Sequence, residues 1–199
     1  MKTMKVKITF IESILGTSPA NPDIYRKFIG SKSPDADTVE DEVANLGADA
    51  VVENSMTVFP KLADGTPFLY DYQIKGFFKD TCGGLRKVNG TLSSKEKAFK
   101  KTIDKLIFPA PRQIPFENYG KIGNCQRPLR ASTPQGERNS LAISEEIPAG
   151  ASITFEIDLY DDAHEALIRE WLDYGKHSGI GQWRNSGKGR FVWEEIETA

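Results

Sequence analysis

The chain has 199 residues, of which 39% are hydrophobic and 27% are charged, and its formal net charge is −2. This composition is typical of a soluble globular protein, and it excludes a membrane-spanning helix because no apolar run approaches the roughly 20 residues that a span requires. Cys82 and Cys125 allow one disulfide but no framework, and His164 and His177 add no metal-ligand cluster, so we expect no cofactor, no metal and a reducing, cytoplasmic environment.

The N-terminal segment alternates apolar and polar residues. Val6, Ile8 and Phe10 are separated by polar side chains, which is the period of a half-buried strand. The basic start of the chain is therefore not followed by the continuous apolar stretch of a secretory signal. Residues 19–56 are rich in Pro, Asp and Glu and are predicted to form a polar insertion.

A turn and an amphipathic helix follow. Asp-Gly-Thr-Pro at residues 64–67 is a turn signal, and apolar residues then recur at helical spacing from Ile74 to Leu85. Lys75 and Lys79 lie in the first turns of this helix, and a helix N-terminus with a lysine is a natural phosphate site. The alternative is an ordinary core helix with exposed lysines.

Most of the positive charge lies in the middle of the chain. The net charge is −4 over residues 1–74, +9 over residues 75–138 and −7 over residues 139–199. Residues 94–106 are predicted to form a lysine-rich helix, and the Pro- and Gly-rich stretch after it to be extended chain or loop. Residues 87–140 are thus expected to be a loop-rich, basic insertion. A polyanion responds to such local charge density, although a solvated basic segment is the alternative.

A strand and a helix precede the C-terminal part. Apolar residues at every second position of residues 153–159 predict a strand. Asp161 or Asp162 can cap the helix that follows, and the apolar residues within 167–172 supply its buried stripe.

The segment after this helix combines glycine with positive charge. Residues 179–189 contain four glycines, accompanied by Arg184, Lys188 and Arg190. Free amides in such a loop can donate to phosphate oxygens, arginine adds bidentate contacts, and Trp183 offers a face on which a base can stack. In the alternative, the glycines only make a tight helix-to-strand connection and Trp183 belongs to the core. The spacing of a P-loop is absent.

The order of these elements predicts the fold class. The chain starts on a strand, places one helix mid-chain and another late, and ends on a strand that begins at residues 191–193. This order suits an α+β protein with a modified ferredoxin-like domain. We therefore expect residues 1–199 to form a single domain that carries the polar and the basic insertions.

Four segments of the chain match one family in order. Residues 8–17 resemble the family's first strand and the glycine after it, and residues 64–76 resemble its turn and helix start. Residues 145–157 resemble its Val-Pro-Ala-Gly turn and strand, and residues 179–191 resemble its signature glycine-rich loop. The chain thus resembles the RAMP superfamily (repeat-associated mysterious proteins), whose members include the backbone subunits of CRISPR effector complexes.

The resemblance implies a modified ferredoxin-like (RRM-like) fold that contacts the backbone of a guide RNA. The contacts would come from the lysine at the helix start and from the glycine-rich loop, and basic residues before the Pro-Ala-Gly turn are weaker candidates. With the cations identified above, the predicted nucleic-acid-binding residues are Lys75, Lys79, Arg130, Arg138, Gly179, Gly181, Arg184, Gly187, Lys188, Gly189 and Arg190.

Departures from the family argue against RNA cleavage. RNA-cleaving members carry a catalytic aspartate upstream of the turn, where this chain has Glu53, Asn54 and Ser55. Repeat-processing members often use a histidine near the first strand, and this chain has none before His164. The helix start also differs, because residues 70–73 read Tyr-Asp-Tyr-Gln where the family has Pro-Gly-Ser-Ser. We therefore predict no catalytic residue.

The predicted function is non-catalytic binding of single-stranded RNA, as a homo-oligomer or a subunit of a larger ribonucleoprotein, away from membranes. Such binding would be electrostatic and largely independent of base sequence, and single-stranded DNA is left open as the ligand. One alternative is an endoribonuclease that uses Glu53, His177 or a metal held by acidic residues. Another is a protein-interaction module, including a phage-borne decoy that mimics or engages a CRISPR effector complex.

Overall fold

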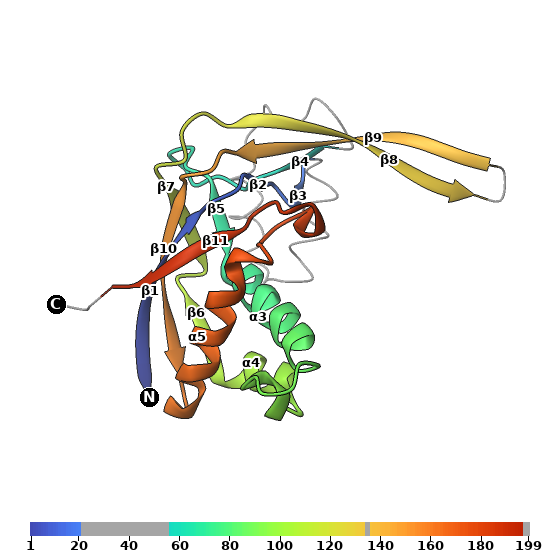
Figure 1. Ribbon diagram of the computed structural model, residues 1–199. Helices are drawn as coiled ribbons and strands as arrows, with labels where there is room; N and C mark the ends of the chain where they lie inside the picture. The colour runs from blue at the N-terminus through green and yellow to red at the C-terminus, as the bar shows by residue number, and fades with distance from the viewer. Residues whose placement is uncertain (21–55, 134–135, 197–199) are drawn as a thin grey trace.

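The computed structural model describes residues 1–20, 56–133 and 136–196, with the backbone alone at residues 129–141. Its main sheet has the strand order β11-β1-β10-β7-β5, and β6 also pairs with β10 (Figure 1). All of these pairings are antiparallel. The strands are β1 (Lys2–Phe10), β5 (Phe68–Tyr70), β6 (Ile107–Ala110), β7 (Gln113–Glu117), β10 (Ser152–Leu159) and β11 (Phe191–Glu195).

The two long central strands supply the middle of the hydrophobic core. β1 and β10 pair over their whole length, from Lys2 opposite Leu159 to Thr9 opposite Ser152. Their apolar residues alternate with polar ones, so one face of each strand is buried and the other is partly exposed. The period-two pattern therefore predicted both strands correctly. The fully buried residues of this face include Met4, Val6, Ile8, Ile153, Ile157 and Leu159.

The buried face of the main sheet is covered by the helices α3 (Asp71–Leu85), α4 (Phe99–Leu106) and α5 (Glu165–Asp173) (Figure 1). The apolar stripe of α3 is buried, and its Phe78 packs on Trp171 of α5 with ring centroids 5.5 Å apart. The predicted helices over residues 74–85 and 167–172 are thus confirmed. Asp161 caps the short 3-10 helix η3 (Asp162–His164) that precedes α5, because its side chain accepts from the amide of Ala163 at 3.0 Å. Helix α5 itself has His164 at its N-cap and no side-chain cap.

The lysine-rich helix begins later than predicted, at Phe99. The preceding residues are tied to α5, because the Glu170 carboxylate accepts from the backbone amides of Leu92 at 2.7 Å and Ser93 at 3.0 Å. It also accepts from the Ser93 hydroxyl at 2.5 Å. These contacts tie the short 3-10 helix η2 (Ser93–Lys95) to α5, and the backbone is extended at Glu96, before α4 begins.

A second sheet lies beyond one end of the main sheet and carries a long hairpin (Figure 1). Its strand order is β2-β9-β4-β3, and β8 pairs with β9. β8 and β9 extend away from the body as a two-stranded arm, in register from Gly123 opposite Glu146 to Thr133 opposite Gly136. The strands are β2 (Ile14–Leu15), β3 (Ser18–Pro19), β4 (Met56–Val58), β8 (Gly123–Thr133) and β9 (Gly136–Ile147).

The protein is an α+β protein, as the sequence predicted. In chain order, the main-sheet strands and the helices of the core are β1, β5, α3, α4, β6, β7, β10, α5 and β11. Part of the predicted basic insertion, residues 107–117, contributes β6 and β7 to the main sheet, while most of the predicted polar insertion lies outside the described residues. Cys82 and Cys125 carry free thiols. Within the described residues, no helix is long and apolar enough to cross a membrane.

Candidate nucleic-acid interface

A cleft of about 780 Å³ separates α3 from the glycine-rich loop, residues 179–190. One wall is the side of α3 on which polar residues recur at helical spacing, together with Phe77 of the buried stripe. The other wall is the start of the loop, and Thr17 and Lys100 complete the lining. Two segments that the sequence analysis selected independently therefore face one another. The α3 wall comprises Tyr72, Gln73, Gly76, Phe77, Lys79 and Asp80, and the loop wall runs from Gly179 to Gln182 with Arg184.

The start of α3 is held by side chains where the family has Pro-Gly-Ser-Ser. The side-chain oxygen of Gln73 accepts from the amide of Tyr70 at 2.8 Å, and its amide nitrogen donates to the Thr17 hydroxyl at 2.8 Å. Tyr72 stacks on Tyr70 with ring centroids 5.1 Å apart and also lines the cleft. This end of the cleft thus presents an aromatic ring and an amide that the sequence analysis had not selected.

The glycines of the loop serve a close crossing of two backbone segments. Ile180 donates its amide to the carbonyl of Gly189 at 3.0 Å, and a Cβ atom on Gly179 or Gly189 would collide with backbone atoms of the opposite segment. Gly181 and Gly187 have φ angles of 92° and 85°, which L side chains rarely adopt. The four glycines therefore make the tight helix-to-strand connection that was the alternative explanation for them.

Lys188 anchors the loop to the body of the protein. Its ammonium group lies 2.7 Å from Glu146 Oε1 and 2.6 Å from the Ser13 hydroxyl, while Ser13 donates to the same carboxylate at 2.6 Å. The backbone amide of Gly189 adds a bond to the Ser13 carbonyl at 2.8 Å. Burial alone would raise the pKa of Glu146, but the hydrogen bonds from Lys188 and Ser13 and the charge of Lys188 outweigh it and hold that pKa below 4.5.

Replacing Glu146 by Gln is expected to destabilise the protein at neutral pH by about 1 kcal/mol, because the variant loses the ion pair while its neighbours stay partly buried. A depressed carboxyl pKa contributes stability that is present above the unfolded value of about 4.5 and is lost as the pH falls through the folded value. The difference in unfolding free energy between the parent and the Glu146→Gln variant should therefore shrink from pH 7 to about pH 3. Urea unfolding at both pH values measures this difference, and a difference that stays constant would contradict the assigned role of the ion pair.

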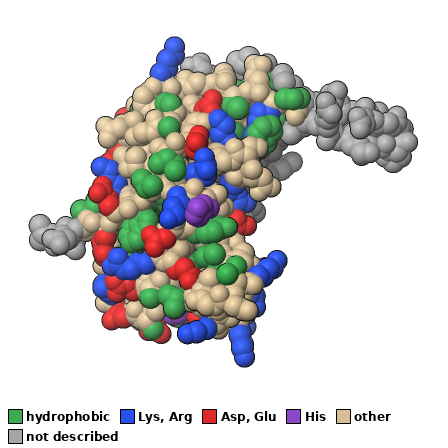
Figure 2. Space-filling model, viewed as in Figure 1, with side chains coloured by type: hydrophobic (Ala, Val, Ile, Leu, Met, Phe, Trp, Pro, Cys, Tyr) green, Lys and Arg blue, Asp and Glu red, His purple; other side chains and the backbone are tan. Residues whose placement is uncertain are grey.

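The other two cations of the loop are also paired with carboxylates. Arg184 lies 2.9 Å from Asp80 of α3, and Arg190 lies 2.9 Å from Glu12. With Lys188 bound to Glu146, each basic side chain of the loop has an acidic neighbour. Basic and acidic side chains are likewise interspersed over the face of the molecule seen in Figure 2. The positive charge that the sequence shows in this loop is therefore largely compensated inside the protein.

The two lysines predicted at the start of α3 lie in different surroundings. Lys79 lines the cleft and forms an ion pair with Asp104 at 2.5 Å. Lys75 is not among the residues that line the cleft; its ammonium group sits 4.5 Å from the centre of the Phe108 ring and donates to the Asp104 carbonyl at 3.4 Å. Burial lowers the pKa of Lys75, against the opposing effect of Asp104. Lys79 is thus the better placed of the two for a ligand in the cleft.

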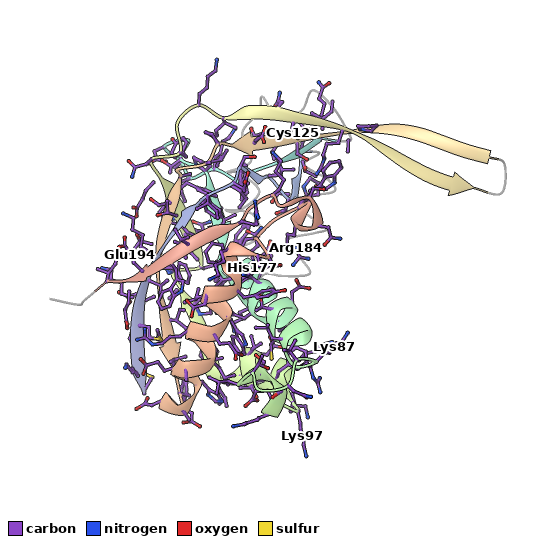
Figure 3. The ribbon with its side chains drawn as sticks, in the orientation of Figure 1. Lys87, Lys97, Cys125, His177, Arg184 and Glu194 are labelled. Carbon is purple, nitrogen blue, oxygen red and sulfur yellow. The ribbon has the colours of Figure 1, made fainter. Side chains whose placement is uncertain are left out.

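A second hollow of about 500 Å³ continues the cleft along α3. The two share Lys79, Asp80 and Lys100, and the second adds Lys87 near the end of the helix. Lys87 and Lys100 are exposed, and neither forms an ion pair within the described part of the chain. Lys87 extends away from the helical layer (Figure 3). Sequence reasoning missed this pair, although the lysine-rich pattern of residues 94–106 contained one of its members.

The remaining predicted residues lie away from the cleft or outside the described residues. Arg130 and Arg138 belong to the arm, where the backbone register places Arg138 opposite Ala131, and their side chains are outside the described part of the chain. His177 follows the helical segment that leads into the loop, with its ring centroid 5.7 Å from that of Tyr174 (Figure 3). Residues 53–55, which the resemblance aligned with the catalytic aspartate of the cleaving members of the family, are outside the described residues.

Comparisons with known proteins yield similarity of structure alone. No protein-family model matches the sequence, and no curated protein matches it. The fold is similar to a chain in the cryo-EM structure of the type III-B Cmr-β complex bound to cognate target RNA, with a TM-score of 0.52 and 11% identity over 98% of this chain and 60% of that one. A chain of a type IV-B CRISPR complex matches with a TM-score of 0.45 and 13% identity, over 100% of this chain and 92% of that one. The neighbours thus come from CRISPR effector complexes, and the chain spans 60% of the length of the Cmr-β subunit that it matches.

Proposed function

We propose that this chain binds single-stranded RNA along the cleft, as a subunit of a CRISPR-type ribonucleoprotein. The observation that supports this most is that α3 and the glycine-rich loop, far apart in the sequence, form opposite walls of one cleft. The family resemblance assigns guide-RNA contacts to these same two segments. Similarity of fold to a subunit of an RNA-bound Cmr-β complex gives the assembly a precedent.

The chemistry along the cleft suits an extended polyanion. Lys79 and Lys100 line both hollows and Lys87 lines the second, so several phosphates of a single strand could be neutralised together. Tyr72 supplies an aromatic surface at one end. The contacts of the lysines engage the sugar–phosphate backbone and impose little sequence preference. The proposed activity is therefore binding of single-stranded RNA without catalysis.

The direct test is a titration of fluorescein-labelled single-stranded RNA, longer than the roughly 4–16 nucleotides that such grooves contact, followed by anisotropy. We expect saturable binding that weakens roughly 20-fold between 50 and 200 mM salt if three phosphates are neutralised. The same strand should remain intact on a denaturing gel with and without magnesium. No anisotropy change at low salt with RNA or with the matching DNA would contradict the proposal, and shorter products would favour the endoribonuclease.

A second candidate is a protein-interaction module that keeps the fold without binding nucleic acid. The ion pairs of the loop favour it, because Arg184, Lys188 and Arg190 already have carboxylate partners. The absorbance ratio at 260 and 280 nm separates the candidates on the protein as first purified. A ratio typical of pure protein, together with no shift of any strand on a native gel, would support the interaction module.

A further inference from the structure

Arg127, in β8 at the base of the arm, is a buried guanidinium that has no counter-charge among the described residues. It is 4% exposed, and its Nε and Nη1 atoms have no hydrogen-bond partner within the described residues. Nη2 alone donates, to the side-chain oxygen of Gln182 at 3.1 Å and weakly to the Ser144 hydroxyl at 3.4 Å. Within the same residues no carboxylate forms an ion pair with it. Burying such a charge is costly, so its presence calls for a reason.

The indole of Trp183 covers this guanidinium. Its ring centroid lies 3.4 Å from Arg127 Cζ, which is the geometry of a stacked cation–π pair. Trp183 adopts φ 57° and ψ 35°, a left-handed conformation that is unusual for a bulky side chain. It is only half-buried and lines a hollow of about 450 Å³ with Gln182 and the following residues of the loop. One part of the tryptophan therefore rests on a cation while another faces an open space.

Arg127 differs from the cations of the loop because no carboxylate among the described residues pairs with it. The three cations of the loop itself are compensated by Glu12, Asp80 and Glu146. Burial lowers the pKa of Arg127, but an arginine keeps its proton at neutral pH. Among the described residues, Arg127 is thus a positive charge beneath the loop without a carboxylate partner, and the indole covers it. Gln182, its hydrogen-bond partner, lines both this hollow and the cleft.

We infer that Trp183 and Arg127 form a nucleotide subsite, in which a nucleobase of the bound strand stacks on the indole. The guanidinium fixes the orientation of the ring and attracts the adjoining phosphate. A purely structural role explains this pair poorly, because an apolar side chain could fill the position of Arg127 without stranding two donors. Strained backbone that persists at one residue is typical of functional positions. The inference rests on the proposed function, to which it adds recognition of the base.

The experiment compares a fluorescein-labelled single-stranded RNA with a fully abasic strand of the same length. The intact protein should bind the base-bearing strand about tenfold more tightly, which is the usual contribution of one stacked base. Trp183→Asn, which suits the left-handed backbone, should lose this ratio and keep its affinity for the abasic strand. Trp183→Phe, which retains an aromatic face, should keep most of the ratio.

Arg127→Met separates binding from folding. Because the methionine strands no donor, this variant should unfold at the same temperature as the parent or higher, and it should bind both strands several-fold more weakly with a reduced ratio. Equal affinity of the intact protein for the two strands, or an unchanged ratio in Trp183→Asn, overturns the subsite and leaves RNA binding standing. Failure of the intact protein to bind either strand overturns both proposals. A large loss of stability in Arg127→Met would assign the arginine to the fold.

Discussion

Replacing Lys87 and Lys100 by glutamate should weaken the binding of single-stranded RNA roughly a hundredfold at physiological salt. Both side chains are exposed and line the continuous hollows along α3, and neither has an ion-pair partner within the described residues. The substitutions therefore leave the folding contacts of these residues intact. They replace two attractive charges by two repulsive ones next to the phosphates, and little else compensates because the cations of the loop are already paired.

The measurement is anisotropy at several salt concentrations, since the slope of log K against log salt counts the neutralised phosphates. Loss of two contacts should reduce that slope by about 1.4. Lys105→Glu with Lys121→Glu is the matched control, because it makes the same change in net charge at exposed residues that do not line either hollow. If the control weakens binding as much as the test pair, the protein attracts RNA by overall charge and the cleft has no special role.

Replacing Gly189 by alanine should cost at least about 3 kcal/mol of unfolding free energy, the range of severe backbone conflicts. Its added Cβ would meet the carbonyl oxygen of Ile180, a backbone atom that cannot swing aside, and φ is +70°. The crossing of the loop would have to open, and the hydrogen bond between Ile180 and Gly189 would be lost with it. Thermal unfolding, read by circular dichroism, should show a midpoint many degrees lower or no cooperative transition.

Gly84→Ala is the control for this substitution. Gly84 lies inside α3, nothing occupies the space around an added Cβ, and alanine is the better helix former by about 0.5–1 kcal/mol. The control should therefore be as stable as the parent or more stable. A Gly189→Ala protein that unfolds at the temperature of the parent would show that the two backbone segments do not approach as closely as described.

Periodicity in the sequence predicted the elements that bury one face. β1, β10, α3 and α5 were all correctly placed, because apolar residues at a fixed spacing reflect burial directly. β6, β7 and β8 were not identified as separate strands, since their segment is rich in Pro and Gly. Proline is tolerated in strands at edges, where its missing N–H group is not required. β6 and β8 each pair on one side only, so their prolines were a poor guide.

The residues of the candidate site could be predicted only in part from the sequence. The loop was selected for its glycines and cations, but the carboxylates that pair with those cations come from residues at least 42 positions away, as Glu146 does for Lys188. Arg127 gave no signal at all, because its significance depends on Trp183, which folds onto it from a distant segment. Lys79 could have been preferred to Lys75 by extending the helical period, which places it on the same stripe as Gln73 and Gly76.

The three ion pairs of the loop mean that the protein's own carboxylates compete with phosphate for the basic side chains. Asp80, Glu12 and Glu146 already occupy the basic side chains, so a phosphate gains there only by displacing a carboxylate that is permanently nearby. When a free nucleotide binds, a basic side chain only exchanges its carboxylate for a phosphate of similar charge, so the gain in binding free energy is small. A polymer that engages several positions at once benefits from the high effective concentration of its linked phosphates. The loop would thus bind small anions weakly, and its affinity for a nucleic acid would increase with the length of the strand.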